Sequence, residues 1–555
     1  MRCWMKSLMG VTAMLSLSLT GRSTAVLELD GAGRATRTLE VPAGERVRLT
    51  LPEGFAATSC NRLLVRMSVT FAKPVHPELP KAFLRWGEPA DDRCAVRLPV
   101  RADGQPHDYP FILDDTPFWQ GSAQTLELEP VCRVAEGRVR IEAVELSRVT
   151  KPTPDQLWDV PALLRTPKAE WGPERHRVVR DDQYREHRVV TRKVWYENEP
   201  LKGRPTRVMA FVSLPEGQGP FPGMVLIHGG GGTAFSDWTE LWAARGYAAI
   251  SMDHYGSEPD GEEATSDRRQ RHRLPDGGPN GSIENPQRLR RQDCWAYHAA
   301  AAVVRAHSLL RSLPQVDAER TGVTGMSWGG YLTSLVIGID PRFKVAIPFY
   351  GCSDLINSFM DTSLIAMGAA NAAEWRLTLD PISFIHRFRG HLLLANNTDD
   401  FAFQLEAHRA TWQQARQTRD GADVWLEVGM PHSMPNARRP QILRYVDFAL
   451  NGGQPLPCLT PLTRSGLTFH TSLKYGAQAV RARLWLTTDP GGFDLTKSGV
   501  SKWTKRRWRH IPASLNGSSI TATLPADVTE RPVRVFIDAT DAAGYTCSTH
   551  FLLVP

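Results

Sequence analysis

The stretch that decides the fold is Thr321-Gly-Val-Thr-Gly-Met-Ser-Trp-Gly-Gly330. A short run typical of a β-strand ends in the pattern G-x-S-x-G, and a segment compatible with a helix follows from Tyr331 to Ile337. This order of strand, sharp turn and helix is the context in which such a serine acts as a nucleophile, with its hydroxyl above the edge of a sheet. Glycines flank the serine because a Cβ there would collide with the neighbouring strand or helix. Ser327 is therefore our candidate nucleophile.

Strands and helices alternate on both sides of this stretch, from about residue 180 to 452. At this spacing they predict a mostly parallel sheet with helices on both faces. Two segments, 256–286 and 352–380, interrupt the pattern; we expect the first to be a long loop over the sheet edge and the second an irregular cap on the site. The predicted strands are 189–196, 206–214, 223–228, 246–252, 343–349, 391–396 and 423–428, and the predicted helices are 234–245, 287–313 and 404–417.

The regions that flank this segment have β-strand patterns instead. Residues 26–150 alternate apolar and polar side chains, as in Arg62-Leu-Leu-Val-Arg-Met-Ser-Val69, and predict a β-sandwich that resembles jelly-roll modules that bind carbohydrate. The Pro-rich residues 151–179 predict a linker. Residues 453–555 alternate again and predict a second, Ig-like β-sandwich.

The N-terminal residues 1–25 have the pattern of a secretory signal peptide. Two basic residues precede a short apolar core, Leu8 to Leu19, and Ser23-Thr24-Ala25 offers small residues at a cleavage site. The apolar core is too short for a transmembrane helix, and no later stretch is long enough. We expect a mature chain that begins near Val26 and is exported, to the periplasm or out of the cell.

Composition sets limits on the function. Of 555 residues, 42% are hydrophobic and 23% charged, which is typical of a globular protein. The net charge of +7 comes mostly from scattered arginines and indicates a basic surface in solvent. The sequence has no motif or basic–aromatic array for nucleic acid, so no nucleic-acid partner is expected.

The cysteines indicate neither a disulfide scaffold nor a zinc site. Of the eight, Cys3 lies in the predicted signal peptide, and the remaining odd number leaves at least one unpaired within the chain. None has the close paired spacing of a zinc site, and we expect no metal and no cofactor. Cys458 and Cys547 lie near the two ends of the C-terminal sandwich, and we expect them to form a disulfide in an exported protein.

A serine nucleophile requires a base that takes its proton and an acid that orients this base. Asp399 and Asp400 follow the predicted strand 391–396, and His432 follows strand 423–428. The order serine, acid, histidine is that of an α/β-hydrolase, with each residue on a loop after a strand. Alone, His432 would be interpreted as a structural loop histidine, but its place in this order favours the catalytic interpretation.

Backbone N–H groups for the oxyanion are expected from the run His228-Gly-Gly-Gly-Gly232, which follows an early strand. We predict an oxyanion hole formed by Gly231, Gly232 and Trp328. A phosphate-binding loop is the alternative interpretation of the glycine run. The run lacks the Gly-Lys-Ser/Thr ending of one such loop and the G-x-G-x-x-G register of another.

Taken together, these motifs are similar to those of a known group of hydrolases. The matching stretches are His228-Gly-Gly-Gly-Gly-Thr-Ala-Phe-Ser-Asp-Trp238, Gly325-Met-Ser-Trp-Gly-Gly-Tyr331, Thr398-Asp-Asp-Phe-Ala402 and Pro431-His432. Residues 180–452 thus resemble the α/β-hydrolase domains of the prolyl oligopeptidase and acetyl xylan esterase group. The resemblance implies an α/β-hydrolase fold, here flanked by the two β-sandwich modules.

The resemblance also bears on the catalytic acid and on the substrate. In that group the acid usually lies three residues after a glycine; Asn397 replaces the glycine here, and the same count selects Asp400, with Asp399 as the alternative. The peptidases of the group carry a β-propeller, for which both flanking modules are too small. Glu262-Glu263 could correspond to the glutamate pair with which aminopeptidases of the group hold a substrate amine, but a solvated loop is the favoured interpretation.

We therefore predict an exported serine ester hydrolase with the triad Ser327, Asp400 and His432, acting on a small-molecule or polysaccharide ester, above all on acyl esters of carbohydrates. One alternative is a peptidase of the prolyl oligopeptidase type. Another is a carbohydrate-binding protein with an inactive core. Trp86, Phe118 and Trp119 could stack on sugars, but core packing is the favoured interpretation for each.

Overall fold

The computed structural model describes residues 25–554 with several gaps. The residues outside the description are 1–24, 36, 52, 54–58, 73–80, 87–94, 116–118, 120–124, 132–135, 266–269, 282, 285–288, 417–421, 490, 491, 495–501, 531 and 555. The predicted signal peptide therefore lies outside the described residues up to Thr24. So do Cys94, Cys132 and Phe118, which fall in other gaps. In the part of the chain that is described, no helix is long and apolar enough to cross a membrane.

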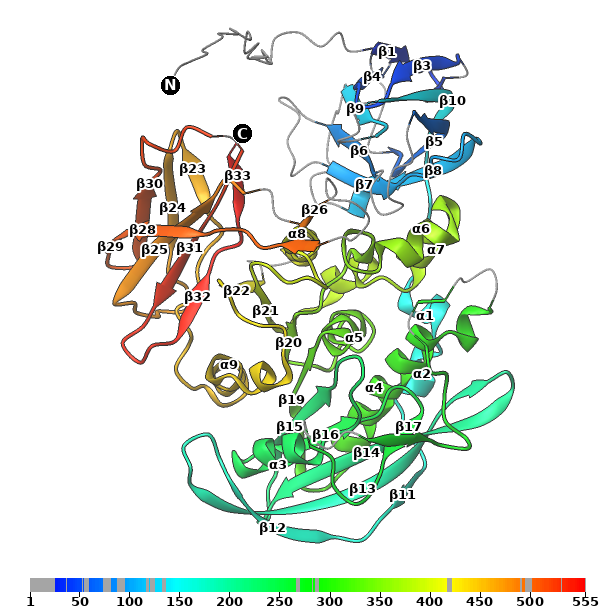
Figure 1. Ribbon diagram of the computed structural model, residues 1–555. Helices are drawn as coiled ribbons and strands as arrows, with labels where there is room; N and C mark the ends of the chain where they lie inside the picture. Colours follow the sequence, from blue (N-terminus) through cyan, green and yellow to red (C-terminus); the bar gives the residue numbers. More distant parts are fainter. Residues whose placement is uncertain are drawn as a thin grey trace, which may run out of the picture.

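A long sheet runs through the middle of the molecule (Figure 1). Its central strands have the order β13-β14-β16-β15-β19-β20-β21-β22, in which β14 alone runs antiparallel to its neighbours. This is the strand order of an α/β-hydrolase, so the predicted fold of the central region is confirmed. The strands are β13 (Glu186–Leu201), β14 (Arg204–Pro215), β15 (Phe221–Ile227), β16 (Ala248–Met252), β19 (Val316–Met326), β20 (Val345–Phe349), β21 (His391–Asn397) and β22 (Asp423–Glu427).

Helices cover both faces of this sheet. Successive side chains of a strand point to opposite faces, so Val225 and Ile227 lie in one hydrophobic core and Met224 and Leu226 in another. Residues of α4, α5 and α8 pack into the first core, and residues of α3 and α9 pack into the second. These helices are α3 (Ser236–Ala244), α4 (Trp295–Arg311), α5 (Trp328–Val336), α8 (Leu405–Ala415) and α9 (Pro440–Asn451).

The two segments that interrupt the pattern differ from the prediction in detail. The helix expected over 287–313 begins only at Trp295, because Cys294 before it has an extended backbone (φ −78°, ψ 146°). The cap over 352–380 was expected to be irregular, but it contains α6 (Asp361–Met367) and α7 (Ala369–Thr378). Gly368 separates the two helices with φ 85°, a conformation that glycine adopts without strain.

The Pro-rich segment 151–179 is folded rather than an extended linker. It forms α1 (Pro154–Leu157), α2 (Val160–Leu163), β11 (Ala169–Trp171) and β12 (Arg175–Arg180), and both strands pair with β13. Prolines lie in the first turns of both helices, where a missing N–H costs nothing. Trp158 between the helices is buried and stacks on Tyr297 of α4 at 5.5 Å between ring centroids. The segment is thereby attached to the hydrolase core.

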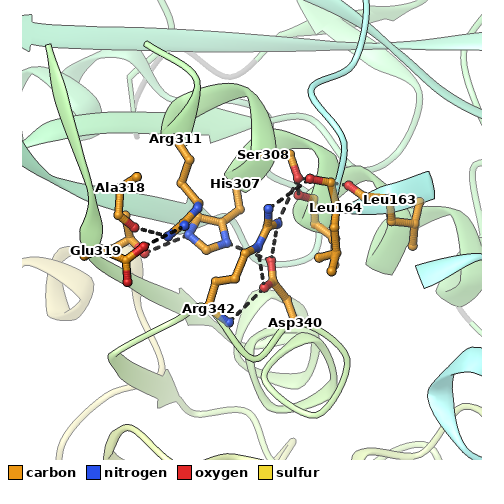
Figure 2. A network of polar contacts seen from close by, with 11 residues as sticks. Leu163, Leu164, His307, Ser308, Arg311, Ala318, Glu319, Asp340 and Arg342 are labelled. Carbon is orange, nitrogen blue, oxygen red and sulfur yellow. Dashed lines mark hydrogen bonds and ion pairs between the residues drawn. The ribbon is translucent and has the colours of Figure 1, made fainter. Parts of the chain in front are cut away.

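A buried polar network ties this segment to the helices behind the sheet, and Figure 2 shows it around Asp340. His307 Nδ1–H donates to Asp340 (2.7 Å), and the Thr321 hydroxyl donates to His307 Nε2 (2.8 Å). Arg342 donates to Asp340 (2.7 Å) and to the carbonyl oxygen of Leu164 (3.0 Å). Asp340, in the loop after α5, therefore contacts α4 directly through His307 and the end of α2 indirectly through Arg342.

The N-terminal strands form two sheets whose buried side chains meet in one core. Trp86 is 3% exposed and meets Trp119 edge to face at 5.2 Å, and the Trp119 indole N–H donates to the carbonyl oxygen of Cys60. Trp86 thus packs in the interior, and Trp119 is partly buried against the same core. The strands are β1 (Ala25–Glu28), β4 (Val47–Thr50), β9 (Thr125–Glu129), β6 (Lys81–Trp86) and β7 (Ala95–Pro99) in one sheet, and β2 (Arg34–Ala35), β3 (Leu39–Pro42), β10 (Gly137–Ser147), β5 (Arg62–Phe71) and β8 (His107–Ile112) in the other.

The C-terminal module, defined here as residues 453–554, joins the central sheet. Val424 of β22 pairs with Ser548 of β32 (Thr546–Ser548), and the sheet continues through β31, β25 and β28. Figure 1 shows this module beside β22. Its other strands are β31 (Val533–Thr540), β25 (Arg481–Thr487), β28 (Arg509–Pro512), β33 (Leu552–Val554), β26 (Gly492–Asp494), β27 (Lys502–Thr504) and a separate sheet of β23 (Thr463–Ser465), β24 (Thr468–Ser472), β30 (Ser519–Thr523) and β29 (Ser514–Asn516).

Candidate functional site

Ser327 lies on the tight turn between β19 and α5. Its backbone has φ 57° and ψ −122°, a conformation that a residue with a side chain adopts only under strain. The turn is held because the Ser327 N–H donates to the carbonyl oxygen of Phe349 (2.8 Å). A Cβ on Gly329 would collide with the carbonyl oxygen of Ile227, and one on Gly325 with that of Gly329. The glycines of the motif are therefore required by the close approach of the start of α5 to β15 and β19.

Asp400 and His432 are brought together by the loops after β21 and β22. His432 Nδ1–H donates to Asp400 Oδ2 at 2.7 Å, and the side-chain amide of Asn397 donates to the same oxygen at 2.9 Å. Asp400 Oδ1 accepts the backbone N–H groups of Ala402 (2.9 Å) and Phe403 (2.7 Å). Asp400 is 1% exposed. The carboxylate is thus fixed by three protein donors besides the imidazole.

Asp399 points away from the imidazole. Its Oδ2 accepts the Thr398 hydroxyl (2.9 Å), and its Oδ1 accepts the backbone N–H of Arg506 (2.8 Å), which belongs to the C-terminal module. Asn397, which stands where the group usually has glycine, accepts the Asp399 N–H through its side-chain oxygen (2.6 Å). The two neighbouring carboxylates therefore have separate partners, and Asp400 alone contacts His432.

Ser327 and His432 face one cavity of about 400 Å³. In the described part of the molecule, no hydrogen bond joins the serine hydroxyl to the imidazole across this cavity. The cavity is lined by Gly229, Gly230, Gly232, Phe235, Met326, Ser327, His432, Ser433, Met434 and Pro435. Apart from His432, none of these residues carries an ionisable side chain, so the cavity suits an uncharged group.

Two aromatic residues that the sequence did not single out hold His432. Tyr350, with φ 48°, stacks on the imidazole at 4.6 Å between ring centroids, and its hydroxyl donates to the Pro431 carbonyl oxygen (2.7 Å). The Phe401 ring also contacts His432, at 5.2 Å between ring centroids, and Phe401 is 51% exposed. Phe401 directly follows Asp400 in the sequence, which was the one available signal. Together they confine the imidazole beside the cavity.

The three predicted oxyanion donors differ in the partners of their N–H groups and in their position relative to the cavity. The Gly232 N–H is taken by the carbonyl oxygen of Gly229 (3.2 Å), which removes Gly232 as a free donor. Gly231 is exposed and is not part of the cavity wall. Trp328 follows the serine at the first turn of α5, where backbone N–H groups have no partner within the helix. Gly229 and Gly230 line the cavity together with Gly232.

Two buried histidines, His228 and His254, hold the glycine turn through its backbone carbonyl oxygens. His228 Nδ1–H donates to the Gly229 carbonyl oxygen (2.8 Å), and His254 Nε2–H donates to the His228 carbonyl oxygen (2.9 Å). The two rings stack at 4.0 Å. Burial lowers the pKa of His254 to about 4 and holds the pKa of His228 well below its ordinary value, so both rings are neutral. His254 follows strand β16, and its role could not be seen from the sequence.

The glutamates considered for binding a substrate amine are occupied elsewhere. Glu263 pairs with Arg175 (2.7 Å) and with Arg177, and Glu262 pairs with Lys193 (3.4 Å). Both face strands β12 and β13 rather than the cavity. Within the described ranges, no group of three or more His, Cys, Asp or Glu side chains is placed to hold a metal ion.

Comparison with protein families agrees with the strand order. A sequence model of the prolyl oligopeptidase family matches residues 279–451, and one of the acetyl xylan esterase (AXE1) family matches residues 184–354. The chain is 28% identical over 238 residues to the uncharacterized peptidase YuxL of Bacillus subtilis (strain 168), covering 40% of this chain. It spans only 31% of the length of that relative.

Solved structures of both kinds of enzyme are also similar to this chain. An acetyl xylan esterase from Paenibacillus sp. R4 is 19% identical with a TM-score of 0.39, covering 53% of this chain and 92% of that one. Pyrococcus horikoshii acylaminoacyl peptidase is 16% identical with a TM-score of 0.34, covering 48% of each chain.

The strand order and the two family matches define the class: this chain is an α/β-hydrolase. More narrowly, its region 184–451 is a hydrolase region of the prolyl oligopeptidase and acetyl xylan esterase group.

Proposed function

We propose that this chain is a serine ester hydrolase that cleaves acyl esters, including acetyl esters, of carbohydrates. The observation that carries the proposal is the shared cavity: Ser327 and His432 face it, and Asp400 accepts a hydrogen bond from His432 (2.7 Å). A strained serine, an imidazole and a buried carboxylate are the three components of a catalytic triad.

In the proposed mechanism His432 removes the proton from the Ser327 hydroxyl as its oxygen attacks the ester carbonyl carbon. Asp400 holds Nδ1–H, so that Nε2 is the nitrogen that accepts this proton. The backbone N–H groups of Trp328 and Gly230 stabilise the negative oxygen that forms. His432 then donates the proton to the departing alcohol, which leaves Ser327 acylated. Water, deprotonated by His432, releases the acid in the second half of the reaction.

The cavity supports a small, uncharged acyl group. Phe235, Met326 and Met434 contribute apolar side chains to its wall, and His432 is its one ionisable side chain. A peptidase that binds a free amino terminus needs a carboxylate near the nucleophile, whereas Glu262 and Glu263 are engaged in ion pairs. The match of residues 184–354 to the acetyl xylan esterase family supports the same class of substrate.

A peptidase is the second candidate, and one observation favours it. The prolyl oligopeptidase family model covers residues 279–451, which include all three proposed triad residues. The acetyl xylan esterase model ends at residue 354, before Asp400 and His432.

We also propose that residues 1–25 are a signal peptide and that the mature chain is exported. Export would expose the enzyme to polysaccharides. We further propose that the two N-terminal sheets form a jelly-roll-like sandwich and that the C-terminal module is Ig-like, as their strand patterns suggest.

The ester and amide hypotheses are separated by a direct comparison of substrates. Purified protein is assayed with 4-nitrophenyl acetate, acetylated saccharides, and prolyl and alanyl 4-nitroanilides. We expect kcat/KM for the esters to exceed that for the amides, because an alcohol leaves without strong protonation. Ser327→Ala should lower ester turnover by at least about 1,000-fold while leaving the fold intact.

Two results would contradict the proposal. If a 4-nitroanilide is cleaved faster than every ester and the activity is lost in Ser327→Ala, the protein is a peptidase. If Ser327→Ala retains the ester activity, Ser327 is not the nucleophile.

A further inference from the structure

The C-terminal module contacts the loop that carries Asp400 through a buried arginine. Arg506 lies between β27 and β28, and only 3% of its side chain is exposed. Its backbone N–H donates to Asp399 Oδ1 (2.8 Å), and its Nη1 donates to the Thr398 carbonyl oxygen (3.2 Å). The two residues directly before Asp400 in the chain are thus held by one residue of another module.

The same arginine also holds the far end of the loop. Its Nη2 donates to Glu406 at 3.0 Å, and Glu406 lies in the first turn of α8, where the loop ends. Arg534 of β31 lies 3.1 Å from the same carboxylate. Two arginines of the C-terminal module therefore converge on Glu406, and Arg506 spans both ends of the loop.

Between these two attachment points the loop wraps around Asp400. The backbone N–H groups of Ala402 and Phe403 and the side-chain amide of Asn397 all donate to the Asp400 carboxylate. Asp399 and Asp400 have different partners: Asp399 accepts a hydrogen bond from Arg506, and Asp400 accepts one from His432. A movement of Thr398 and Asp399, which Arg506 contacts, would therefore also move the Asp400 carboxylate that orients the imidazole.

The cost of burying Arg506 argues for a specific role. Removal of a guanidinium from water is strongly unfavourable unless its hydrogen bonds to water are replaced by well-placed acceptors. The fork of an arginine can meet several acceptors at fixed angles, which an apolar side chain or a lysine cannot do. Here the acceptors are a carbonyl of the catalytic loop and a carboxylate at the start of α8.

We propose that Arg506 is a positioning residue for catalysis, which acts through Thr398 and Asp399 to hold Asp400 against His432. This inference rests on the triad of the proposed function. It makes the C-terminal module part of the catalytic apparatus, although none of its described residues lines the cavity.

The first test compares Arg506→Met with Arg507→Met in the full chain. Arg507 is the matched control, because it is the next residue, is 91% exposed and forms its ion pair with Asp489 rather than with the loop of Asp400. With 4-nitrophenyl acetate we expect Arg506→Met to lower kcat by about 10- to 100-fold with little change in KM, as expected for a small displacement of a catalytic group. Arg507→Met should keep both constants. Unchanged kcat in folded Arg506→Met would overturn the proposal.

The second test separates positioning from a general loss of stability. If Arg506 acts through Asp400, Arg506→Met should cause no further loss of kcat in an Asp400→Asn background, because the group that it positions is already gone. Losses that multiply in the double variant would show that Arg506 acts by another route. If Arg506→Met does not fold, Arg506→Lys replaces it: a lysine keeps the charge but cannot span both acceptors, so an intermediate loss of kcat is expected, and wild-type kcat would count against the proposal.

A third measurement does not depend on substrate. Hydrogen exchange at the Ala402 and Phe403 amides should be faster in Arg506→Met than in the wild type, with no change in Arg507→Met. If the wild-type protein hydrolyses no ester but these amides respond, the proposed function fails while the contact stands. If the wild type is active and the amides do not respond, the positioning role fails.

Discussion

At the scale of single residues, Asp400 provides a sharp test of the triad. Asp400→Asn keeps the size of the side chain but places an N–H donor where the imidazole Nδ1–H now donates. The imidazole is then held in the wrong tautomer, and kcat should fall by about 10,000-fold. Steady-state kinetics with 4-nitrophenyl acetate measures the loss, and the thermal midpoint reports whether the variant is folded. A kcat near that of the wild type would exclude Asp400 as the acid.

Glu284 predicts a dependence of stability on pH. Burial raises the pKa of its carboxyl group from the ordinary value of 4.5 to about 7. The hydrogen bond from the Trp295 N–H (3.3 Å) lowers the pKa but does not outweigh the burial. Below pH 4.5 the carboxyl is protonated in the folded and unfolded chain, so it has no effect. Between pH 4.5 and 7 only the unfolded chain ionises, and the folded state loses stability as pH rises.

Glu284→Gln should remove this loss. We expect the variant and the wild type to have similar thermal midpoints at pH 4 and the variant to have the higher midpoint at pH 8. Thermal unfolding measured across this range checks the prediction. An equal midpoint at pH 8 would show that Glu284 ionises freely in the folded protein.

The sequence predicted the proposed triad residues because each follows a strand in a recognisable local pattern. It could not predict Tyr350 or His254, whose contacts depend on strands that are distant in the sequence and meet only in the sheet. Nor could the sequence show the local turn of the glycine run, in which the Gly232 N–H donates to the Gly229 carbonyl oxygen.

At the scale of elements, we expect Asp340 at the centre of the network in Figure 2 to stabilise the packing of helices α2, α4 and α5. Burial raises the pKa of Asp340, but His307 and Arg342 outweigh this effect and hold it below its ordinary value. Asp340→Asn removes the charge that both partners contact and should destabilise the protein by about 3–5 kcal/mol, the usual cost of breaking a buried ion pair.

Glu319 is the control for this prediction, since it belongs to the same network but its side chain is 75% exposed. Glu319→Gln should leave the denaturant midpoint unchanged, because an exposed ion pair contributes little. Chemical denaturation of both variants gives the comparison. Equal midpoints for Asp340→Asn and the wild type would show that the buried network does not stabilise the fold.

The element boundaries were predicted well where hydrophobic periodicity is strong and poorly where prolines dominate. The strands of the central sheet agree with their predicted ranges within a few residues at most ends. The segment 151–179 was misjudged because its prolines were interpreted as breaks, whereas they lie in the first turns of two short helices. The side chain that fixes the segment, Trp158, gives no local signal of its partner Tyr297.

At the scale of the whole molecule, Cys458 near the start of the C-terminal module lies beside Cys547 of its penultimate strand, and both are free thiols in the structure. Both are buried, and their sulfur atoms lie 3.3 Å apart, close enough to be joined after a small movement. In an exported chain we expect them to be oxidised to a disulfide, which would stabilise the module by about 3–5 kcal/mol.

Peptide mapping without reductant checks this expectation. A linked pair of peptides containing residues 458 and 547 is the expected result, with Cys294 as the internal control. Burial raises the pKa of the Cys294 thiol to about 12, so it should remain unoxidised. Two free thiols at 458 and 547 in protein isolated from an oxidising compartment would contradict the prediction.

The join between β22 and β32 could not be predicted, because a pairing between Val424 and Ser548 leaves no local pattern in the sequence. It has a practical consequence for anyone who shortens the chain. The match to the prolyl oligopeptidase family ends at residue 451, so this position looks like a natural place to shorten the chain. Such a fragment would present β22 as an uncovered edge strand, with unpaired backbone groups that can recruit another copy. The apparent domain boundary is therefore a poor place to cut: the truncated enzyme should aggregate through the edge that the C-terminal module now covers.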